Sequence, residues 1–577
     1  MLLYKNLFIA VFYSSIYSIL FSGCYSRHQK TQDTTEPDAA VVYFDKNIDI
    51  AALNEKISKF VPDSTLAGAF YRSNNYSTLW INGGLDIGLI KDALAILEQN
   101  STHGLPSGLF RQTEIKNIVD SIERKNYLDN DYLDALTRLE IFLTEATINY
   151  SAIIHYGYLN PKDLFPLDYH IEIKRPDSIF YNDVVYASLM ASPISLLIDI
   201  QPKDKVYHRM QQDILKWEQY KDYTFVPIKE KKSKQNYKIG ERDSAISYIA
   251  QRLALTGDYI LPDTLTEIFS DELLIAVNNF RRINGFPEEE EIGKLTIDAL
   301  NKPIMHYYNK TIANLERYRW KRLKNRDNGK NIEVNVAGAY LIAIGDNVPL
   351  KMNVCVGQFK TRTPLLQSDI SYLNLNPVWN VPTSISQGEI CLKMKRDSTY
   401  IQRQNMRIYS NGTEVDPTTI DWKNINCNRF YYTIKQDPGN GNSLGRIKFM
   451  FNNKFSVYLH DTPSKSTFKR KNRAVSHGCV RVENPVELAF FCTSAKDPVY
   501  KDRLRYSIDK SPQTTEGKAL LKKDGLTKLQ DIINLKQKIP VSIDYFTIYM
   551  LPGDESLYYA DDVYGFDKEI VKRLNLE

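Results

Sequence analysis

The sequence predicts a multidomain α+β protein in which helical domains come first and a β-rich mixed domain follows. A length of 577 residues is enough for three or four domains of about 150 residues each. Between about 45 and 225, apolar residues recur at three- and four-residue intervals, as on one face of a helix. After about residue 330 they alternate with polar residues, which is typical of strands.

The first helical region contains two amphipathic stretches. The run Leu133–Ile154 keeps helical spacing up to Gly157, where we expect the helix to end. His103 and His155 have no companion cluster of acids or ligands, so we expect both to be structural. The other stretch is defined by Leu89, Ile90, Ala93, Leu94 and Leu97.

A smaller helical unit is predicted at 238–303, after a basic stretch, Lys229–Lys238, that is typical of a solvated linker. Its two helical patterns are Ile246–Leu253 and Leu273–Arg282. The unit resembles peptidoglycan-binding modules of three short helices, although any small helical bundle shares this periodicity. The matching positions are Arg252, Leu253, Ala276, Val277, Phe280, Gly285, Phe286, Ile292, Gly293, Thr296, Ala299, Leu300 and Asn301.

In the β-rich part, Asn331–Ala343 and Lys351–Val356 alternate like strands. Phe455–Leu459 is expected to be a buried strand that places His460 at its end. Asn484 suits a helix N-cap and Pro485 the first helical position, so a helix is predicted from there to about Cys492.

His460 and Cys479 are the most informative residues. Cys479 lies in the run Ser476-His477-Gly478-Cys479-Val480-Arg481, just before that helix. A thiol is a useful nucleophile only as thiolate, and an adjacent imidazole can take its proton near neutral pH. Gly478 permits a close backbone approach, so N–H groups beside Cys479 could face a developing oxyanion. The pattern therefore predicts covalent acyl transfer.

Two histidines compete for the role of base. His477 would share a face with Cys479 on an extended strand, whereas His460 must arrive by folding. Spacing alone does not choose between them. A fixed cation at Arg481 could lower the pKa of the thiol or hold a substrate carboxylate, and an ion pair with Glu483 or another acid is the alternative.

A metal site is the rival chemistry. Zinc needs three or four ligands, and the other cysteines show no paired spacing that would supply them, so no metal is expected. The same spacing argues against a disulfide framework. We expect single buried thiols, with one bridge left open, at Cys355, Cys391, Cys427 and Cys492.

The histidine followed at a distance by Ser-His-Gly-Cys-Val-Arg resembles the L,D-transpeptidases of bacterial cell walls, with a YkuD-type catalytic domain. The runs Asn376–Pro382 and Pro438–Phe449 resemble the large YcbB-type branch, which adds a scaffold and a peptidoglycan-binding domain. Asp561–Gly565 matches a closing element of that branch, to which the sequence alone assigns no role.

The resemblance implies a domain order. It comprises a signal at 1–24, a flexible tether at 25–44, a helical scaffold at 45–225, the peptidoglycan-binding-like unit at 238–303, a catalytic domain at 310–500 with a capping insertion near 386–435, and a C-terminal extension at 501–577 that completes the catalytic and scaffold region.

The resemblance also implies a mechanism. Cys479 would attack the carbonyl before the terminal D-Ala of a donor stem peptide, and His460 would accept and return the proton. Gly478 and Cys479 N–H groups would hold the oxyanion, with Ser476, His477 and Arg481 around the pocket. An amine of a neighbouring stem would resolve the thioester. No cofactor is implied; the partners are peptidoglycan stem peptides, and cell-wall synthases are further partners that the resemblance allows.

The N-terminus predicts the location. Leu7–Phe21 is a short apolar run, and the following Ser22-Gly23-Cys24 resembles a bacterial lipoprotein signal. Lipidation of Cys24 would anchor the protein to a membrane of the cell envelope, facing the periplasm. The polar residues 25–37 would form a tether. A net charge of +5 is too small to imply nucleic-acid binding.

Two other functions stay open at this point. An L,D-carboxypeptidase would use the same nucleophile with water as the acceptor. A non-catalytic, wall-binding lipoprotein would keep the motif without activity. The expected transpeptidase is favoured because the resemblance spans most of the chain.

Overall fold

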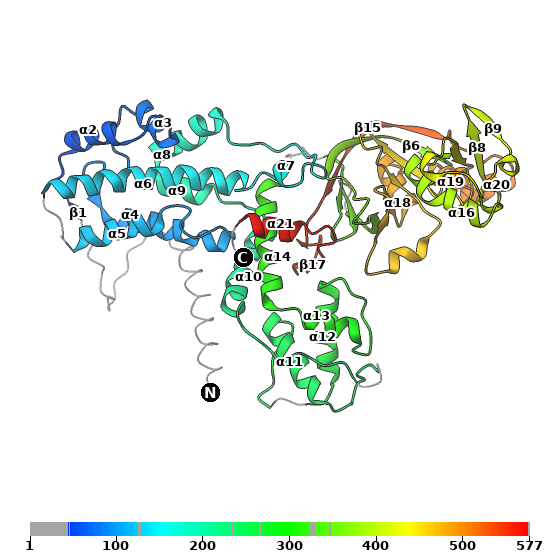
Figure 1. The fold of residues 1–577 in the computed structure, drawn as a ribbon, viewed down its shortest axis with the longest axis horizontal. Helices are drawn as coiled ribbons and strands as arrows, with labels where there is room; N and C mark the ends of the chain where they lie inside the picture. Colours follow the sequence, from blue (N-terminus) through cyan, green and yellow to red (C-terminus); the bar gives the residue numbers. More distant parts are fainter. Residues whose placement is uncertain are drawn as a thin grey trace.

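The computed structural model describes residues 44–45, 47–124, 129–231, 235–264, 267–321, 329–345 and 348–574. It is an elongated molecule with a helical body at one end and a β-rich body at the other (Figure 1). The predicted signal, Cys24 and nearly all of the tether lie outside the described residues. No helix within the described ranges is long and apolar enough to cross a membrane. The α+β fold class is confirmed.

The scaffold region is a bundle around the long helix α6 (Asp129–Tyr156). The helix ends immediately before Gly157, as predicted; Gly157 has φ +85°, and a Cβ there would lie 2.5 Å from the Trp320 ring. The other main helices of the bundle are α2 (Ile50–Phe60), α3 (Leu66–Ser73), α4 (Ile87–Glu98), α5 (Gln112–Glu123), α8 (Ala187–Ala191) and α9 (Pro193–Asp199). Helix α10 (Lys205–Tyr220) follows, but its buried residues belong to the core of the β-rich body.

The small unit consists of α11 (Ser244–Thr256), α12 (Asp271–Ile283) and α13 (Lys294–Leu300) around its own core. Part of the predicted linker belongs to this unit rather than to solvent. Tyr237 is buried in the core, pairs with Ile292 and donates its hydroxyl to the Lys229 carbonyl at 2.9 Å.

Helix α14 (Ile304–Trp320) ties the bodies together, and the sequence did not predict it. It packs between α10 and the C-terminal helix α21 (Phe566–Arg573). Arg317 and Lys310 of α14 both pair with the buried Asp567 of α21. A buried charge is tolerated only when it is paired, so the C-terminal extension and α14 depend on each other.

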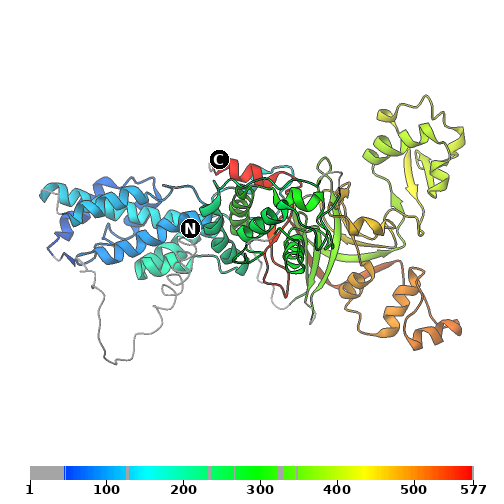
Figure 2. The same ribbon diagram turned by 90° about the horizontal axis from the view of Figure 1, so that it is seen from below.

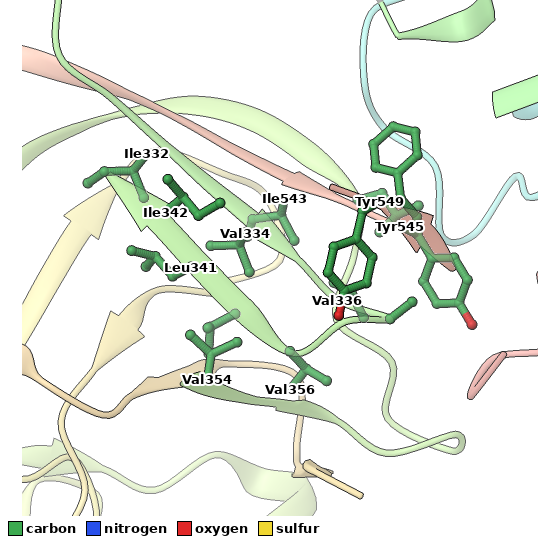
Figure 3. Packing of buried hydrophobic residues seen from close by; sticks show 14 of the residues in the cluster. Ile332, Val334, Val336, Leu341, Ile342, Val354, Val356, Ile543, Tyr545 and Tyr549 are labelled. Carbon is green, nitrogen blue, oxygen red and sulfur yellow. The ribbon is translucent and has the colours of Figure 1, made fainter. Parts of the chain in front are cut away.

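The catalytic domain is built on a sheet in the order β13-β5-β14-β12-β11-β6-β15-β3-β4, and β4 also pairs with β5, so the sheet closes on itself. Inward-facing aliphatic side chains such as Ile332, Val334, Leu341 and Val354 pack in its core (Figure 3). The strands are β3 (Asn331–Asn335), β4 (Tyr340–Ile344), β5 (Leu350–Gly357), β6 (Leu366–Leu375), β11 (Ile447–Phe451), β12 (Leu459–His460), β13 (Ala474–Ser476), β14 (Val480–Val482) and β15 (Ile532–Asp544).

Two strand predictions need correction. The stretch expected to be one strand over Asn331–Ala343 is a hairpin, because the chain turns between β3 and β4 and Ala339 has φ +50°. Phe455–Val457 is a loop rather than a strand. The Asn453 side chain accepts from the N–H groups of Phe455 and Val457 at 3.0 Å, and Ser456 has φ +55°, so only Leu459 and His460 remain extended.

The predicted helix after the cysteine is confirmed as α18 (Pro485–Thr493). Pro485 takes the first helical position, as expected. Asn484 occupies the N-cap position, but its side chain makes no capping hydrogen bond.

Two lobes project from the barrel (Figure 2). The capping subdomain, residues 379–436, has its own core and the sheet β7-β10-β8-β9, from β7 (Trp379–Asn380), β8 (Met406–Ser410), β9 (Thr413–Val415) and β10 (Thr433–Gln436). The other carries α19 (Pro498–Ser507) and α20 (Thr515–Lys522) before β15 returns to the barrel. A disulfide joins Cys391 and Cys427 in the capping subdomain, and it is one bridge of the kind that the sequence left open, whereas Cys355 and Cys492 are single buried thiols.

Candidate active site

Three neighbouring strands bring the candidate residues together. β12 pairs antiparallel with β11, so that Lys448 lies beside His460, and parallel with β14, so that Leu459 lies beside Val480. Leu459 and Val480 are fully buried in the barrel core. Because side chains alternate along a strand, the opposite face receives their neighbours. His460 and Arg481 are strand residues on that face, and the charges of Lys448 and Arg481 also act on Cys479, which lies in the loop just before β14.

His460 is buried and has a defined tautomer. Its Nδ1 lies 2.5 Å from the main-chain oxygen of Asp461. A carbonyl oxygen can only accept, so Nδ1 carries the proton and Nε2 keeps its lone pair. Burial, together with the nearby charges of Arg481 and Lys448, lowers the pKa of His460 to about 3. The imidazole is therefore neutral at neutral pH and can accept a proton.

Cys479 is half-buried, and its Sγ lies 3.9 Å from the main-chain oxygen of Ser456. Burial raises the pKa of the Cys479 thiol. This increase is only partly offset by hydrogen bonds from the N–H and hydroxyl of Tyr458 and by the positive charges of Lys448 and Arg481. The charge of Arg481 thus lowers the pKa of the Cys479 thiol, as expected, but burial raises that pKa by more. The resting group is a thiol that needs a base.

The residues that precede Cys479 form a tight loop, Ser476–Cys479, which we call the cysteine loop. Ser476 Oγ donates to the Cys479 carbonyl at 2.6 Å and accepts from the Gly478 N–H at 3.1 Å. Gly478 has φ +115°, a conformation that favours glycine. The Gly478 N–H, expected to face an oxyanion, is thus already engaged. In the described part of the chain, the Cys479 N–H has no acceptor.

His477 and Cys479 do not follow the alternation of an extended strand, since β13 ends at Ser476. The His477 Nε2 instead contacts the carboxylate of Glu389, in η4 (Ser386–Ile390) of the capping subdomain. Neither side chain is fully buried. This contact connects the capping subdomain directly to the cysteine loop, and no sequence signal predicts it.

Arg481 does not form the ion pair with Glu483 that was considered as its alternative. The Glu483 carboxylate accepts from the Asn353 N–H at 3.0 Å. The Nε of Arg481 is buried and has no hydrogen-bond partner in the described residues. A buried guanidinium N–H without a partner is unusual, and it is available to a ligand.

The basic segment between His460 and Cys479 is anchored. Phe468 is buried, Lys465 pairs with Asp461 at 2.7 Å, and Lys471 pairs with Asp561 at 2.9 Å. The Lys471 ammonium also lies 3.5 Å from the ring centroid of Phe286 in the small helical unit. The segment therefore joins three regions of the protein.

Tyr458 and Lys448 also belong to the site, and neither was predicted from the sequence to have a role. The ring centroids of Tyr458 and His460 lie 5.6 Å apart. The Lys448 Nζ lies 3.8 Å from the Tyr458 ring centroid. The two-residue step from Tyr458 to His460 was a usable signal for a shared face. Lys448 could be placed only from the pairing of β11 with β12.

No group of three or more His, Cys, Asp or Glu residues is arranged to hold a metal ion in the ranges that the structure describes.

The site lies within a recognisable domain. Residues 329–500 match the family model of the L,D-transpeptidase catalytic domain, YkuD, and residues 65–213 match that of a scaffold domain. The chain carries a YkuD-type L,D-transpeptidase catalytic domain. A Haemophilus influenzae protein assigned as an L,D-transpeptidase is 35% identical over 222 residues, which is 38% of this chain and 41% of that protein. The alignment thus covers about two fifths of this curated relative.

Two solved L,D-transpeptidase structures also match this chain at 14% identity. The structure from Xylanimonas cellulosilytica covers 46% of this chain and 96% of its own, with a TM-score of 0.15. The structure from Stackebrandtia nassauensis covers 46% of this chain and 91% of its own, with a TM-score of 0.18.

Proposed function

We propose that the protein is an L,D-transpeptidase that cross-links peptidoglycan stem peptides through a thioester on Cys479. The observation that carries the proposal is that a neutral, oriented His460 in β12 and Cys479, which lies just before the paired strand β14, belong to a domain that matches this catalytic family. The same site could pass the acyl group to water, which would make the protein a carboxypeptidase.

In the first step, His460 Nε2 takes the thiol proton as Cys479 Sγ attacks the carbonyl carbon that precedes the terminal D-Ala of a tetrapeptide stem. The carbonyl π electrons move to its oxygen, and the Cys479 N–H donates to the resulting oxyanion. Tyr458, whose hydroxyl approaches Sγ, is close enough to assist.

The tetrahedral intermediate then collapses. Its C–N bond breaks, the imidazolium of His460 gives its proton to the departing D-Ala amine, and a thioester remains. An amine of a neighbouring stem attacks the thioester carbonyl and loses a proton to His460. Cys479 leaves as thiolate and recovers the proton. No metal or organic cofactor is needed for any of these steps.

Positive charge around the pocket suits a substrate with carboxylates. Arg481 has a buried, unpartnered Nε beside Cys479 and is the group we assign to a stem-peptide carboxylate. The remaining proposals follow from sequence: a lipid anchor at Cys24, a periplasm-facing location in a bacterial envelope, and wall binding by the helical unit at 238–303.

The test is mass spectrometry of muropeptides after incubation of the chain from residue 25 onward with disaccharide-tetrapeptide. A dimer formed with loss of one D-Ala supports the proposal. Cys479→Ala should abolish it, whereas Cys355→Ala, which removes a buried thiol outside the mechanism, should retain it. Tripeptide without dimer would identify a carboxypeptidase, and unchanged substrate with wild-type protein would refute both activities.

A further inference from the structure

A closed set of hydrogen bonds lies behind the cysteine loop. The Gly357 N–H donates to Thr363 Oγ1 at 2.8 Å, and Thr363 Oγ1 donates to the Gly478 carbonyl at 2.8 Å. The Thr363 N–H donates to the Tyr564 hydroxyl at 3.0 Å, which in turn donates to the Gly357 carbonyl at 2.7 Å. Thr363 and Tyr564 are both buried. We call this set the Thr363–Tyr564 strut.

The direction of each bond in the strut is fixed by chemistry. A main-chain N–H can only donate and a carbonyl can only accept, so the Thr363 hydroxyl proton must point to Gly478. In a trans peptide the carbonyl and the following N–H point in opposite directions. Fixing the Gly478 carbonyl therefore fixes the Cys479 N–H on the other side of the same peptide plane.

The cysteine loop leaves that N–H as its available donor. Ser476 already accepts from the Gly478 N–H and donates to the Cys479 carbonyl. The peptide between Gly478 and Cys479 is thus held from both ends, with the Cys479 N–H unengaged among the described residues. A donor held in place before the substrate arrives is what stabilises an oxyanion most effectively.

We propose that Thr363 and Tyr564 are positioning residues for acyl transfer: they hold the Gly478–Cys479 peptide so that the Cys479 N–H faces the oxyanion. This inference rests on the proposed function. It gives a role to the closing element Asp561–Gly565, which supplies the Tyr564 hydroxyl from the far end of the chain.

The scaffold region supports the same strut. The Arg362 guanidinium pairs with Asp168 at 2.8 Å and lies 5.6 Å from the centroid of the Tyr564 ring. The Leu365 N–H donates to the Asp168 carbonyl at 2.8 Å. Gly357 is also required, because a Cβ there would lie 2.1 Å from the Thr361 carbonyl oxygen. The scaffold thus helps to hold the segment that positions the catalytic peptide.

Two reagents separate this role from a general loss of structure. An activated ester, p-nitrophenyl acetate, acylates Cys479 through an oxyanion and releases p-nitrophenolate as the sulfur bond forms. Iodoacetamide alkylates the same sulfur by displacing iodide, with no oxyanion. The ratio of the two rates therefore reports oxyanion stabilisation independently of the wall substrate.

Thr363→Val should lower the acylation rate by about 100-fold, the usual effect of losing an oxyanion donor. Its alkylation rate should stay within about twofold, since the thiol is not touched. Thr363→Ser, which keeps the hydroxyl, should preserve both rates. Tyr564→Phe should show the same separation, and Tyr559→Phe, whose hydroxyl bonds to Asp213 at 2.9 Å, is the matched control.

Equal losses of both rates in Thr363→Val and Tyr564→Phe, no loss of either rate, or the absence of a Cys479-dependent ester reaction in the wild type would overturn the inference. If the two variants show the separation but the wild-type protein makes no muropeptide product, the proposed function is refuted and the positioning role stands. If the wild-type protein forms the muropeptide dimer but the two variants do not show the separation, the positioning role is refuted and the proposed function stands.

Discussion

Reduction of the Cys391–Cys427 disulfide should loosen the capping subdomain while leaving the barrel folded. The bridge closes a segment with a sequence separation of 36 residues. Loop-closure entropy for a segment of that size corresponds to about 4 kcal/mol at 25 °C. The subdomain's small core gives little other stability. Its local unfolding should therefore become about 600-fold more frequent, since 1.4 kcal/mol is a factor of ten.

Hydrogen exchange followed by mass spectrometry measures this directly. Ile408 and Ile434 lie on strands that pair in the subdomain. After reduction, the amide N–H groups of peptides that contain them should exchange faster, by the factor given above. Peptides from β3 and β15 in the barrel serve as the internal control. A change below about tenfold in the subdomain would refute the reasoning, because it would mean that the bridge contributes less than about 1.4 kcal/mol. Cys391→Ala with Cys427→Ala should reproduce the effect without reductant.

Three further predictions concern charge and proton binding. The rate of Cys479 alkylation by iodoacetamide should rise with pH through a pKa above that of an ordinary thiol, with no step near pH 6.5; such a step would mean that His460 titrates there. Burial lowers the pKa of His103 in the folded protein to about 3. As the pH drops below about 6.5, His103 is therefore protonated in the unfolded chain but not in the folded protein, and the free energy of unfolding falls. His103→Gln should shrink the loss in unfolding free energy between pH 7 and 5 by about 2 kcal/mol, and an unchanged loss in urea titrations would contradict the assignment. Glu389→Gln should weaken the contact with His477 and increase hydrogen exchange in η4 while the alkylation rate of Cys479 is unchanged; equal exchange in both proteins would show that the contact does not hold the subdomain.

Local signals in the sequence predicted the features that short segments determine. Gly157 ends a helix because its positive φ suits glycine, and Pro485 begins one because its missing N–H is not needed there. The split of Asn331–Ala343 into a hairpin was missed, because alternation continues across a turn that only Ala339's positive φ marks.

In the candidate site, too, the sequence predicted what short segments determine and missed what depends on how distant segments pack together. His460 and Cys479 were found from residue type and motif; His460 lies in β12, and Cys479 lies just before β14, the strand that pairs with β12. Lys448, Glu389 and Thr363 were missed, because strand pairing and domain docking bring them to the site and no sequence spacing encodes either. The expected Gly478 donor is engaged for a local reason, since the hydroxyl of Ser476, two residues earlier, accepts from its N–H.

The central claim is that Cys479 carries the acyl group. Rapid acid quenching after mixing with disaccharide-tetrapeptide, followed by peptide mapping with mass spectrometry, tests it most directly. We expect a disaccharide-tripeptide thioester on the peptide that contains Cys479, sensitive to hydroxylamine and absent from Cys479→Ala. Turnover with an acyl group on any other residue, or with none trapped and an active Cys479→Ala variant, would contradict it.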